Sequence, residues 1–142
     1  MQLSIAKADL MRALTSARSV VPNRSTIPII GNVRLIANGD GRLDLSGTDL
    51  DRQCSDSGPA MIGTQGAVTV PADIMLQAVK AMPSGDVHLT LDAGNGRLEM
   101  RSGRTKYRLA TLPADDFPEL ARDAAHVSLT LPCTVAARLL AE

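Results

Sequence analysis

The sequence predicts an α+β fold in which two helices pack on antiparallel sheets, in the order β-α-β-β-β-β-α-β-β-β. Only two stretches before residue 120 repeat apolar residues at helical spacing, whereas most of the others alternate apolar and polar residues as strands do. Short turns rich in Gly, Asn and Asp separate the alternating runs, and such turns favour hairpins over the long crossovers of a parallel sheet.

The first half begins with a short strand at Gln2–Ala6 and a helix at Lys7–Ser19. The helix prediction depends on an apolar face at i, i+4 and i+7, formed by Leu10, Leu14 and Ala17. Four strand signals follow the polar loop after this helix. They are an apolar run at Ile29–Ala37, a return strand with Leu43 and Leu45 after the turn at Asn38–Gly41, a polar run at Leu50–Ser57 expected near a sheet edge, and a short run at Gly66–Val70.

The second half begins with a helix at Ala72–Met82, which Pro71 introduces and the run Pro83-Ser84-Gly85 ends. The apolar face of this helix is expected to hold Ile74, Met75, Ala78, Val79 and Met82. Three alternating runs joined by glycine-containing turns complete the sheet, and they carry Val87–Leu91, Leu98–Met100 and Tyr107–Leu109.

The predicted domain covers residues 1–120, and residues 121–126 form a linker. Alternation then resumes in residues 127–131, and a helix is predicted at Thr134–Ala141. This strand followed by a helix repeats the pattern that opens the chain. Residues 127–142 are therefore expected to begin a second domain that is cut short at Glu142.

Charge is balanced over the whole chain but segregated along it. The formal net charge is zero, so the molecule as a whole does not attract nucleic acid. Residues 1–24 hold four cations and one carboxylate, residues 97–108 hold five and one, and residues 113–126 hold four carboxylates and one cation. Such segregation serves contact with DNA or pairing between subunits, and it is equally compatible with an ordinary solvated surface.

Composition limits the core and the mode of binding. Hydrophobic residues make up 44% of the 142 residues but aromatic residues only 1%, so Leu, Ile, Val, Met and Ala have to fill the core. The scarcity of aromatic residues argues against single-strand binding by base stacking, which needs aromatic platforms.

The histidines and cysteines form no recognisable site. His88 and His126 lack the partner residues of a catalytic or metal centre and are interpreted as surface residues. Cys54 and Cys133 lie far apart, as expected for free thiols in a reducing cytosol. The chain opens without a signal-peptide pattern, and no segment reaches the roughly 20 apolar residues that span a bilayer. A cytoplasmic protein is expected.

Two carboxylate pairs, Asp49/Asp51 and Asp115/Asp116, are the remaining candidates for a metal site. Turn and capping roles are commoner than Mg²⁺ binding for aspartates in such loops. No metal, no cofactor and no catalytic residue is therefore expected.

Several runs of the sequence, in order, are T-I-P-I-I-G-N-V-R-L, L-D-L-S-G-T-D-L-D, V-T-V-P-A and R-S-G-R-T-K-Y-R-L-A-T-L-P-A-D-D-F-P-E-L. From residue 1 to about residue 120 this set resembles the first domain of the bacterial sliding clamp, the β subunit of DNA polymerase III. The run V-S-L-T-L-P and the helix after it resemble the start of that family's second domain.

The resemblance implies a DNA-clamp fold whose helices line a central hole. Subunits of the family carry three such domains, and two subunits close head to tail into a ring that slides on double-stranded DNA. The ring gives the replicative polymerase its processivity, as an accessory subunit of a nucleotidyltransferase holoenzyme that does no bond chemistry itself. Sliding requires phosphate contacts without base readout, since base-specific hydrogen bonds would create stops.

The resemblance also assigns candidate DNA contacts. Arg24, on the loop after the first helix, matches a basic residue that reaches DNA in the family. Arg12 and Lys80 match basic positions that face the hole, and Lys7 is a further candidate. Asp73 departs from the pattern, because family members can carry basic residues there. We expect Asp73 to weaken the positive lining and to alter subunit contacts.

Arg104, Lys106 and Tyr107 match the strand that forms the subunit interface of the ring. Tyr107 is expected to be the apolar anchor, and the cations are expected to pair with acidic residues of the partner's third domain. The alternative is an exposed basic edge strand that resists aggregation.

In the family, the polymerase and the clamp loader bind a cleft between the second and third domains, which these 142 residues lack. We therefore expect an N-terminal clamp fragment that does not close a ring and binds DNA weakly. A second hypothesis is a decoy or binding module that pairs with full-length clamps through the Tyr107 strand. A third is a metal-dependent hydrolase that uses Asp115 and Asp116.

Overall fold

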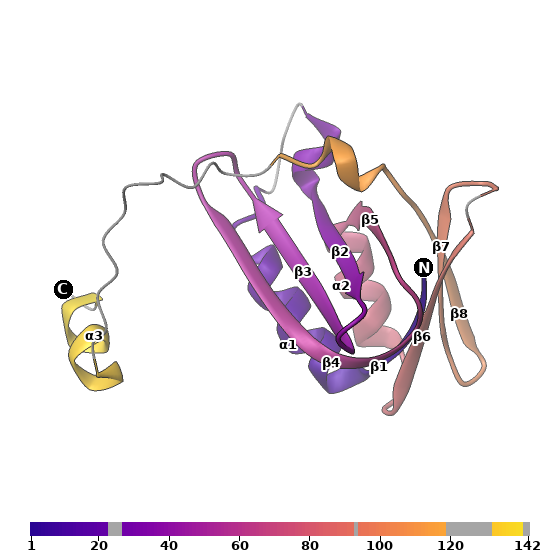
Figure 1. Cartoon of the computed structure of the whole chain (residues 1–142), viewed down its shortest axis with the longest axis horizontal. Coiled ribbons are helices and arrows are strands. Elements are labelled where there is room, and N and C mark those ends of the chain that lie inside the picture. Colours follow the sequence, from indigo (N-terminus) through magenta and orange to yellow (C-terminus); the bar gives the residue numbers. More distant parts are fainter. Residues whose placement is uncertain (23–26, 93, 119–131, 141–142) are drawn as a thin grey trace.

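The computed structural model describes residues 1–22, 27–92, 94–118 and 132–140, and its elements follow the predicted order (Figure 1). The strands are β1 (Gln2–Ala6), β2 (Asn32–Asn38), β3 (Arg42–Thr48), β4 (Gln53–Thr64), β5 (Gly66–Pro71), β6 (Asp86–Asp92), β7 (Arg97–Ser102) and β8 (Thr105–Ala110). The helices are α1 (Lys7–Arg18), α2 (Ala72–Ala81) and α3 (Cys133–Leu140), and short 3-10 helices lie at η1 (Pro28–Gly31) and η2 (Ala114–Asp116).

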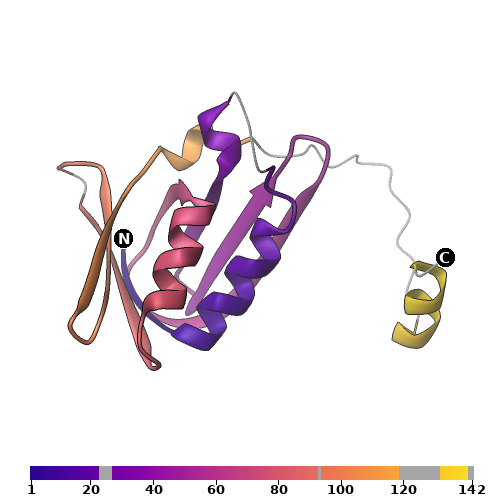
Figure 2. The same ribbon diagram turned by 180° about the vertical axis from the view of Figure 1, so that it is seen from behind.

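The eight strands form one antiparallel sheet in the order β5-β2-β3-β4-β1-β6-β7-β8. Figure 2 shows α1 and α2 side by side on one face of this sheet, and no described helix lies on the opposite face. The α+β class with few helices on antiparallel strands, predicted from hairpin turns and helical periodicity, is therefore confirmed.

The core lies between the two helices and the sheet. Leu10, Leu14 and Ala17 of α1 are fully buried, as their helical spacing predicted. Each large aliphatic side chain buried in this way contributes about 1.5–3 kcal/mol relative to an exposed position. The sheet presents the alternate residues of its strands to the helices, namely Leu3, Ile5, Val33, Leu35, Leu43, Leu45, Val68, Val70, Val87, Leu89, Leu98 and Met100.

The strand predicted at Ile29–Ala37 begins later, at Asn32, because Pro28–Gly31 forms η1. Proline fixes its own φ near the helical value and has no N–H to give to a neighbouring strand. The turn closes when the backbone N–H of Ile30 donates to the carbonyl of Ile27, at 3.1 Å. The first three residues of the apolar run therefore form part of a helical turn that precedes the strand.

The prediction that Leu50–Ser57 lies near a sheet edge is wrong, because the corresponding strand β4 lies between β3 and β1. One side of β4 packs against α1, and its residues there include the small Gly58 and Ala60. The other side faces solvent, so polar residues are tolerated there. The polar composition of β4 therefore reflects one solvated face and gives no information about its neighbours.

Ile74 is also misplaced by the sequence prediction. It was expected on the apolar face of α2, yet 55% of it is exposed, whereas Met75, Ala78 and Val79 are buried. The buried stripe of a helix packed on a single sheet is narrow, and Ile74 falls on its flank.

The two outer strands of the sheet differ in how their edges are covered. Thr69 of β5 exchanges two backbone hydrogen bonds with Leu112, at 3.0 and 3.1 Å, and Phe117 is buried nearby with the Arg34 guanidinium 5.1 Å from its ring centre. By contrast, the part of the chain that the structure describes places nothing along the far edge of β8. The sheet therefore has one covered edge and one open edge.

The remaining prediction concerns the second domain. Its strand at residues 127–131 lies outside the described residues, and its helix is α3, which begins one residue earlier than expected. Among the described helices, none is both long and apolar enough to cross a membrane.

Candidate nucleic-acid interface and open strand edge

Three of the four predicted DNA-contacting residues lie on the helix layer. Lys7 and Arg12 belong to α1 and Lys80 belongs to α2, whereas Arg24 lies outside the described residues. The helices run antiparallel, because the start of α1 contacts the end of α2 and the end of α1 contacts its start. The three side chains are therefore carried by one layer of the fold.

Lys7 joins the two helices. Its Nζ donates to the carbonyl of Met82 at 2.5 Å and to that of Lys80 at 3.5 Å. These carbonyls at the end of α2 lack partners within the helix, and a cation there complements the helix dipole. Lys7 therefore has a local structural role, and its charge lies at one end of the helix layer.

Arg12 lies on the exposed flank of α1 beside β4, where its Nη2 donates to the carbonyl of Ser57 at 3.2 Å. A guanidinium has five N–H donors, so one such bond leaves others available to a phosphate. Lys80 is exposed, and within the described residues its ammonium makes no hydrogen bond or ion pair. Arg12 and Lys80 are therefore the described candidates with donors to spare.

Asp73 has a specific partner. The Arg18 guanidinium donates to Oδ1 of Asp73 through Nε at 2.6 Å and Nη2 at 2.5 Å, with 55% of the aspartate side chain exposed. The pair links the end of α1 to the start of α2, where a carboxylate also complements the helix dipole. At this end of the helix layer a cation is thus neutralised by the protein itself.

The predicted interface residues lie on one hairpin but do not share one face. Tyr107 turns toward the helix side and packs against the core, whereas Lys106 turns to the opposite face, where its Nζ lies 3.4 Å from Oε1 of Glu99. Arg104 is exposed in the turn between β7 and β8. The open edge of β8 therefore offers an apolar side and a basic side.

Ile74 extends the apolar side of this edge, and the sequence analysis did not assign it there. Asp73 and the carbonyl of Lys80 contact α1, so helical spacing puts Ile74 on the flank of α2 away from α1. α2 also packs against β8. Ile74 is recognised as a contact residue by its high exposure at an apolar position of the helix. This exposure is visible only in the structure.

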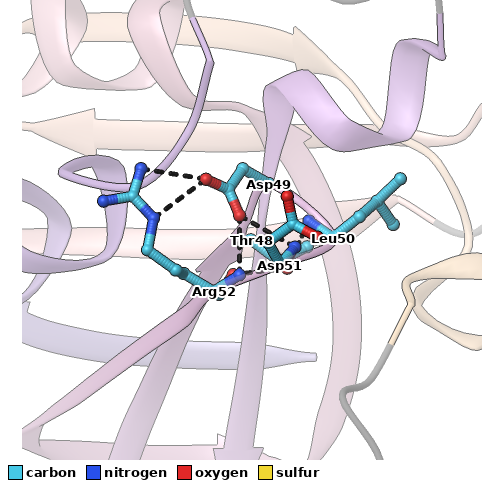
Figure 3. A network of polar contacts seen from close by, with 5 residues as sticks. All are labelled: Thr48, Asp49, Leu50, Asp51 and Arg52. Atoms are coloured by element: carbon cyan, nitrogen blue, oxygen red, sulfur yellow. Dashed lines mark hydrogen bonds and ion pairs between the residues drawn. The ribbon is translucent and has the colours of Figure 1, made fainter.

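A rigid turn between β3 and β4 is a second feature that the sequence did not reveal (Figure 3). Asp49 accepts from the backbone N–H groups of Asp51 and Arg52 and from the Arg52 guanidinium. The Arg52 N–H, followed by its guanidinium, holds the pKa of Asp49 below its usual range. This carboxylate, considered above for metal binding, serves as a turn cap.

The described residues contain no group of three or more His, Cys, Asp or Glu side chains arranged to hold a metal ion. Asp115 and Asp116 lie in η2 at the surface, and Cys54 and Cys133 are free thiols. The described residues therefore present two contact surfaces, a helix layer with exposed cations and an open strand edge.

Comparison with known proteins identifies the fold and the family. Residues 1–121 match the family described as DNA polymerase III beta subunit, N-terminal domain. The beta sliding clamp of Caulobacter vibrioides is 43% identical over 124 residues, which cover 87% of this chain and 33% of that protein. The beta sliding clamp of Escherichia coli strain K12 is 33% identical over 142 residues, covering 99% of this chain and 38% of the relative.

Solved structures agree with these matches. The DNA polymerase sliding clamp from Caulobacter crescentus superposes with a TM-score of 0.84 at 42% identity, covering 87% of this chain and 34% of that one. The DNA polymerase III subunit beta from Pseudomonas aeruginosa gives a TM-score of 0.91 at 26% identity, covering 99% and 38%. The chain thus spans between a third and two fifths of the length of these relatives, and it belongs to the DNA polymerase III beta subunit family, whose N-terminal domain it carries.

Proposed function

We propose that this chain forms one wall of a sliding clamp that encircles double-stranded DNA and confers processivity on DNA polymerase III. The observation that carries the proposal is the helix layer, on which Lys80 makes no internal polar contact among the described residues and Arg12 has guanidinium donors beyond its one bond to Ser57. Their long, flexible side chains suit phosphate contacts, which hold a protein on DNA without reading sequence. Arg24 is also proposed to contact DNA. Lys7 is proposed to contribute a positive charge at one end of the helix layer.

Within this proposal, residues 1–120 form the first clamp domain, residues 121–126 a linker, and residues 127–142 the start of a second clamp domain. The chain does no bond chemistry and requires no cofactor. It acts in the cytoplasm, and the polymerase and the clamp loader bind other parts of the ring.

The open edge of β8 is proposed as the head-to-tail subunit interface. Unpaired backbone groups along this edge can continue the sheet into a partner subunit. Tyr107 and Ile74 supply apolar contacts on the helix side, and Arg104 and Lys106 supply charges for acidic residues of the partner. The Arg18–Asp73 pair keeps the nearby end of α2 electrically balanced.

The DNA contact is tested by the salt dependence of binding to a fluorescent 20-base-pair duplex. The logarithm of the affinity falls with the logarithm of salt concentration by about 0.9 per phosphate contact. Lys80→Gln is expected to lower this slope by about one contact. Arg97→Gln, on strand β7 away from the helix layer, is the control and should leave the slope unchanged. Equal effects of both variants would show that the helix layer is not the DNA surface.

A second candidate function, a module that pairs with full-length clamps, is favoured by the same open edge of β8. It predicts that the chain co-elutes with the full-length Caulobacter vibrioides clamp in size-exclusion chromatography. Tyr107→Ser should abolish co-elution and Met61→Ser, on the solvent side of β4, should not. Independent elution of the unaltered chain would exclude this function and leave the DNA test unaffected.

A further inference from the structure

The sheet face away from the helices carries a groove of about 580 Å³ across β4, β1, β6 and β7. Strand register places Met61, Ser4, His88 and Arg101 opposite one another in a single row across these four strands. At one end of the groove the register of β1 against β4 shifts, because β4 holds the extra residue Gly63. Bulges of this kind redirect side chains and recur beside binding sites. The proposed clamp surfaces use none of this row.

The charges around the groove favour an anion. Arg101 lies directly opposite Lys106 in the β7–β8 pair, and like charges in that position are destabilising. Lys106 is held by Glu99, whereas Arg101 makes no hydrogen bond or ion pair within the described ranges. Glu99 is also opposite Arg108 in register, so its own charge is offset on two sides. Arg101 is thus the cation with no internal partner at this groove.

Three further residues make the groove suitable for a peptide. The Ser4 hydroxyl lies 2.8 Å from Nδ1 of His88, which fixes the imidazole ring in the groove wall. Met61 is 81% exposed at the other end of the row and supplies an apolar, adaptable surface. The volume lies within the range of small-ligand sites, so it accommodates a few residues of an extended chain.

We propose that this groove binds an acidic peptide segment of a partner protein, with a carboxylate on Arg101 and a neighbouring apolar side chain on Met61. Arginine binds carboxylates through two parallel hydrogen bonds, which gives both strength and orientation. Single-stranded nucleic acid fits the groove less well, because no aromatic side chain lines it for base stacking. The site is independent of the proposed ring, since it uses neither the helix layer nor the edge of β8.

The test is an NMR titration of the ¹⁵N-labelled full chain with the acetylated, amidated peptide Gly-Leu-Glu-Leu-Glu-Gly. Backbone amides of Ser4, Met61, His88 and Arg101 are expected to shift together. Arg101→Gln should weaken binding about tenfold, the usual size of a lost charge-assisted hydrogen bond, and Met61→Ser should weaken it as well. Arg97→Gln removes an exposed cation from the same strand outside the groove, and it should change the dissociation constant less than twofold.

Three results would overturn the proposal. The first is an equal affinity for the peptide in which both glutamates are glutamines, since no carboxylate would then be recognised. The second is an equal loss in Arg97→Gln and Arg101→Gln, which would indicate diffuse charge attraction. The third is a larger shift of the same amides by a 12-base-pair duplex than by the peptide, which would assign the groove to nucleic acid.

Discussion

Leu50 is a residue whose backbone conformation does not suit its side chain. Its φ of 79° lies in the left-handed region, where an L-residue with a β-carbon is strained, and its side chain is half exposed. The surrounding turn holds it there: Thr48 Oγ1 donates to the Arg52 carbonyl at 2.7 Å and accepts from the Leu50 N–H at 3.1 Å. The hydrogen bonds of the turn therefore outweigh the strain.

Replacing Leu50 by glycine should stabilise the protein by about 1 kcal/mol, because glycine adopts a positive φ without strain. The greater conformational entropy of glycine in the unfolded chain opposes this gain but cancels only part of it. Urea denaturation measures the change. Leu50→Ala is the matched control, since alanine loses the exposed side chain but keeps the strained β-carbon. A similar gain in both variants would show that side-chain exposure, and not backbone strain, is relieved.

Asp49 gives the same turn a dependence on pH. Its pKa is lowered from 3.8 by the Arg52 N–H and guanidinium, so the folded state favours the carboxylate. This stabilisation is present in full above the unfolded pKa and is lost as pH falls through the folded value. Asp49→Asn keeps an oxygen acceptor for the two backbone N–H groups and loses the charge.

The stability difference between the unaltered chain and Asp49→Asn should therefore be largest near neutral pH and shrink as pH falls below 3.8. Urea midpoints from pH 7 to pH 2 measure it. Asp51→Asn, whose carboxylate makes no hydrogen bond in the described residues, should stay level with the unaltered chain throughout. A pH-independent deficit in Asp49→Asn would mean that hydrogen-bond geometry, and not charge, stabilises the turn.

At the scale of elements, the approach of α1 to β3 depends on Gly47. A β-carbon at position 47 would lie 2.0 Å from the Ala17 carbonyl oxygen and 2.9 Å from Cγ2 of Val21. A backbone oxygen in the last turns of a helix cannot move away without displacing the helix. The end of α1 can therefore lie this close to the sheet only above a glycine.

Gly47→Ala should destabilise the protein by about 3 kcal/mol, the upper end of the cost of overpacking a core. Gly58→Ala is the matched control on the neighbouring strand, where the new β-carbon would meet its nearest atoms at 3.4 Å, an ordinary contact. Its effect should stay below about 1 kcal/mol. Thermal unfolding compares the two variants, and equal losses would show that the close helix approach is not what selects glycine at position 47.

The elements that the sequence predicted well are those with a strong period and a clear boundary. α1 and α2 differ from their predicted ranges by one residue each, because Leu10, Leu14 and Met75 mark faces that only a helix brings together. The position of β4 could not be predicted, since strand order depends on long-range pairing that a local pattern does not contain.

The candidate site was predictable in part. The order of motifs located Arg12, Lys80 and Tyr107 on the correct elements. The competing bond from Arg12 to Ser57 and the Arg18–Asp73 pair join residues 45 and 55 positions apart, so no local spacing reveals them. The groove beside Arg101 depends on four strands in register and could not be read from any one of them.

For the whole molecule, the two edges of the sheet differ in how they can contact another subunit. Leu112 bonds to the β5 edge within the same chain, whereas β8 leaves its edge open among the described residues. The proposed head-to-tail ring would therefore use β8, whose unpaired backbone groups can accept a strand of the partner. Since the chain spans about a third of the Caulobacter vibrioides clamp, a ring has to be tested in a longer protein.

A chimera provides that protein, with residues 1–118 of this chain in place of the matched segment of the Caulobacter vibrioides clamp. At 43% identity over 124 residues, the new domain should accept the host's remaining domains and pair through β8.

The chimera should sediment as a dimer, remain on nicked circular plasmid after loading, and leave when the plasmid is linearised, because a closed ring is held by topology. The double variant Arg104→Glu/Tyr107→Ser should sediment as a monomer and be lost from circular plasmid as well. A chimera that stays bound after linearisation would be held by contacts alone, and the ring proposal for this domain would then fail.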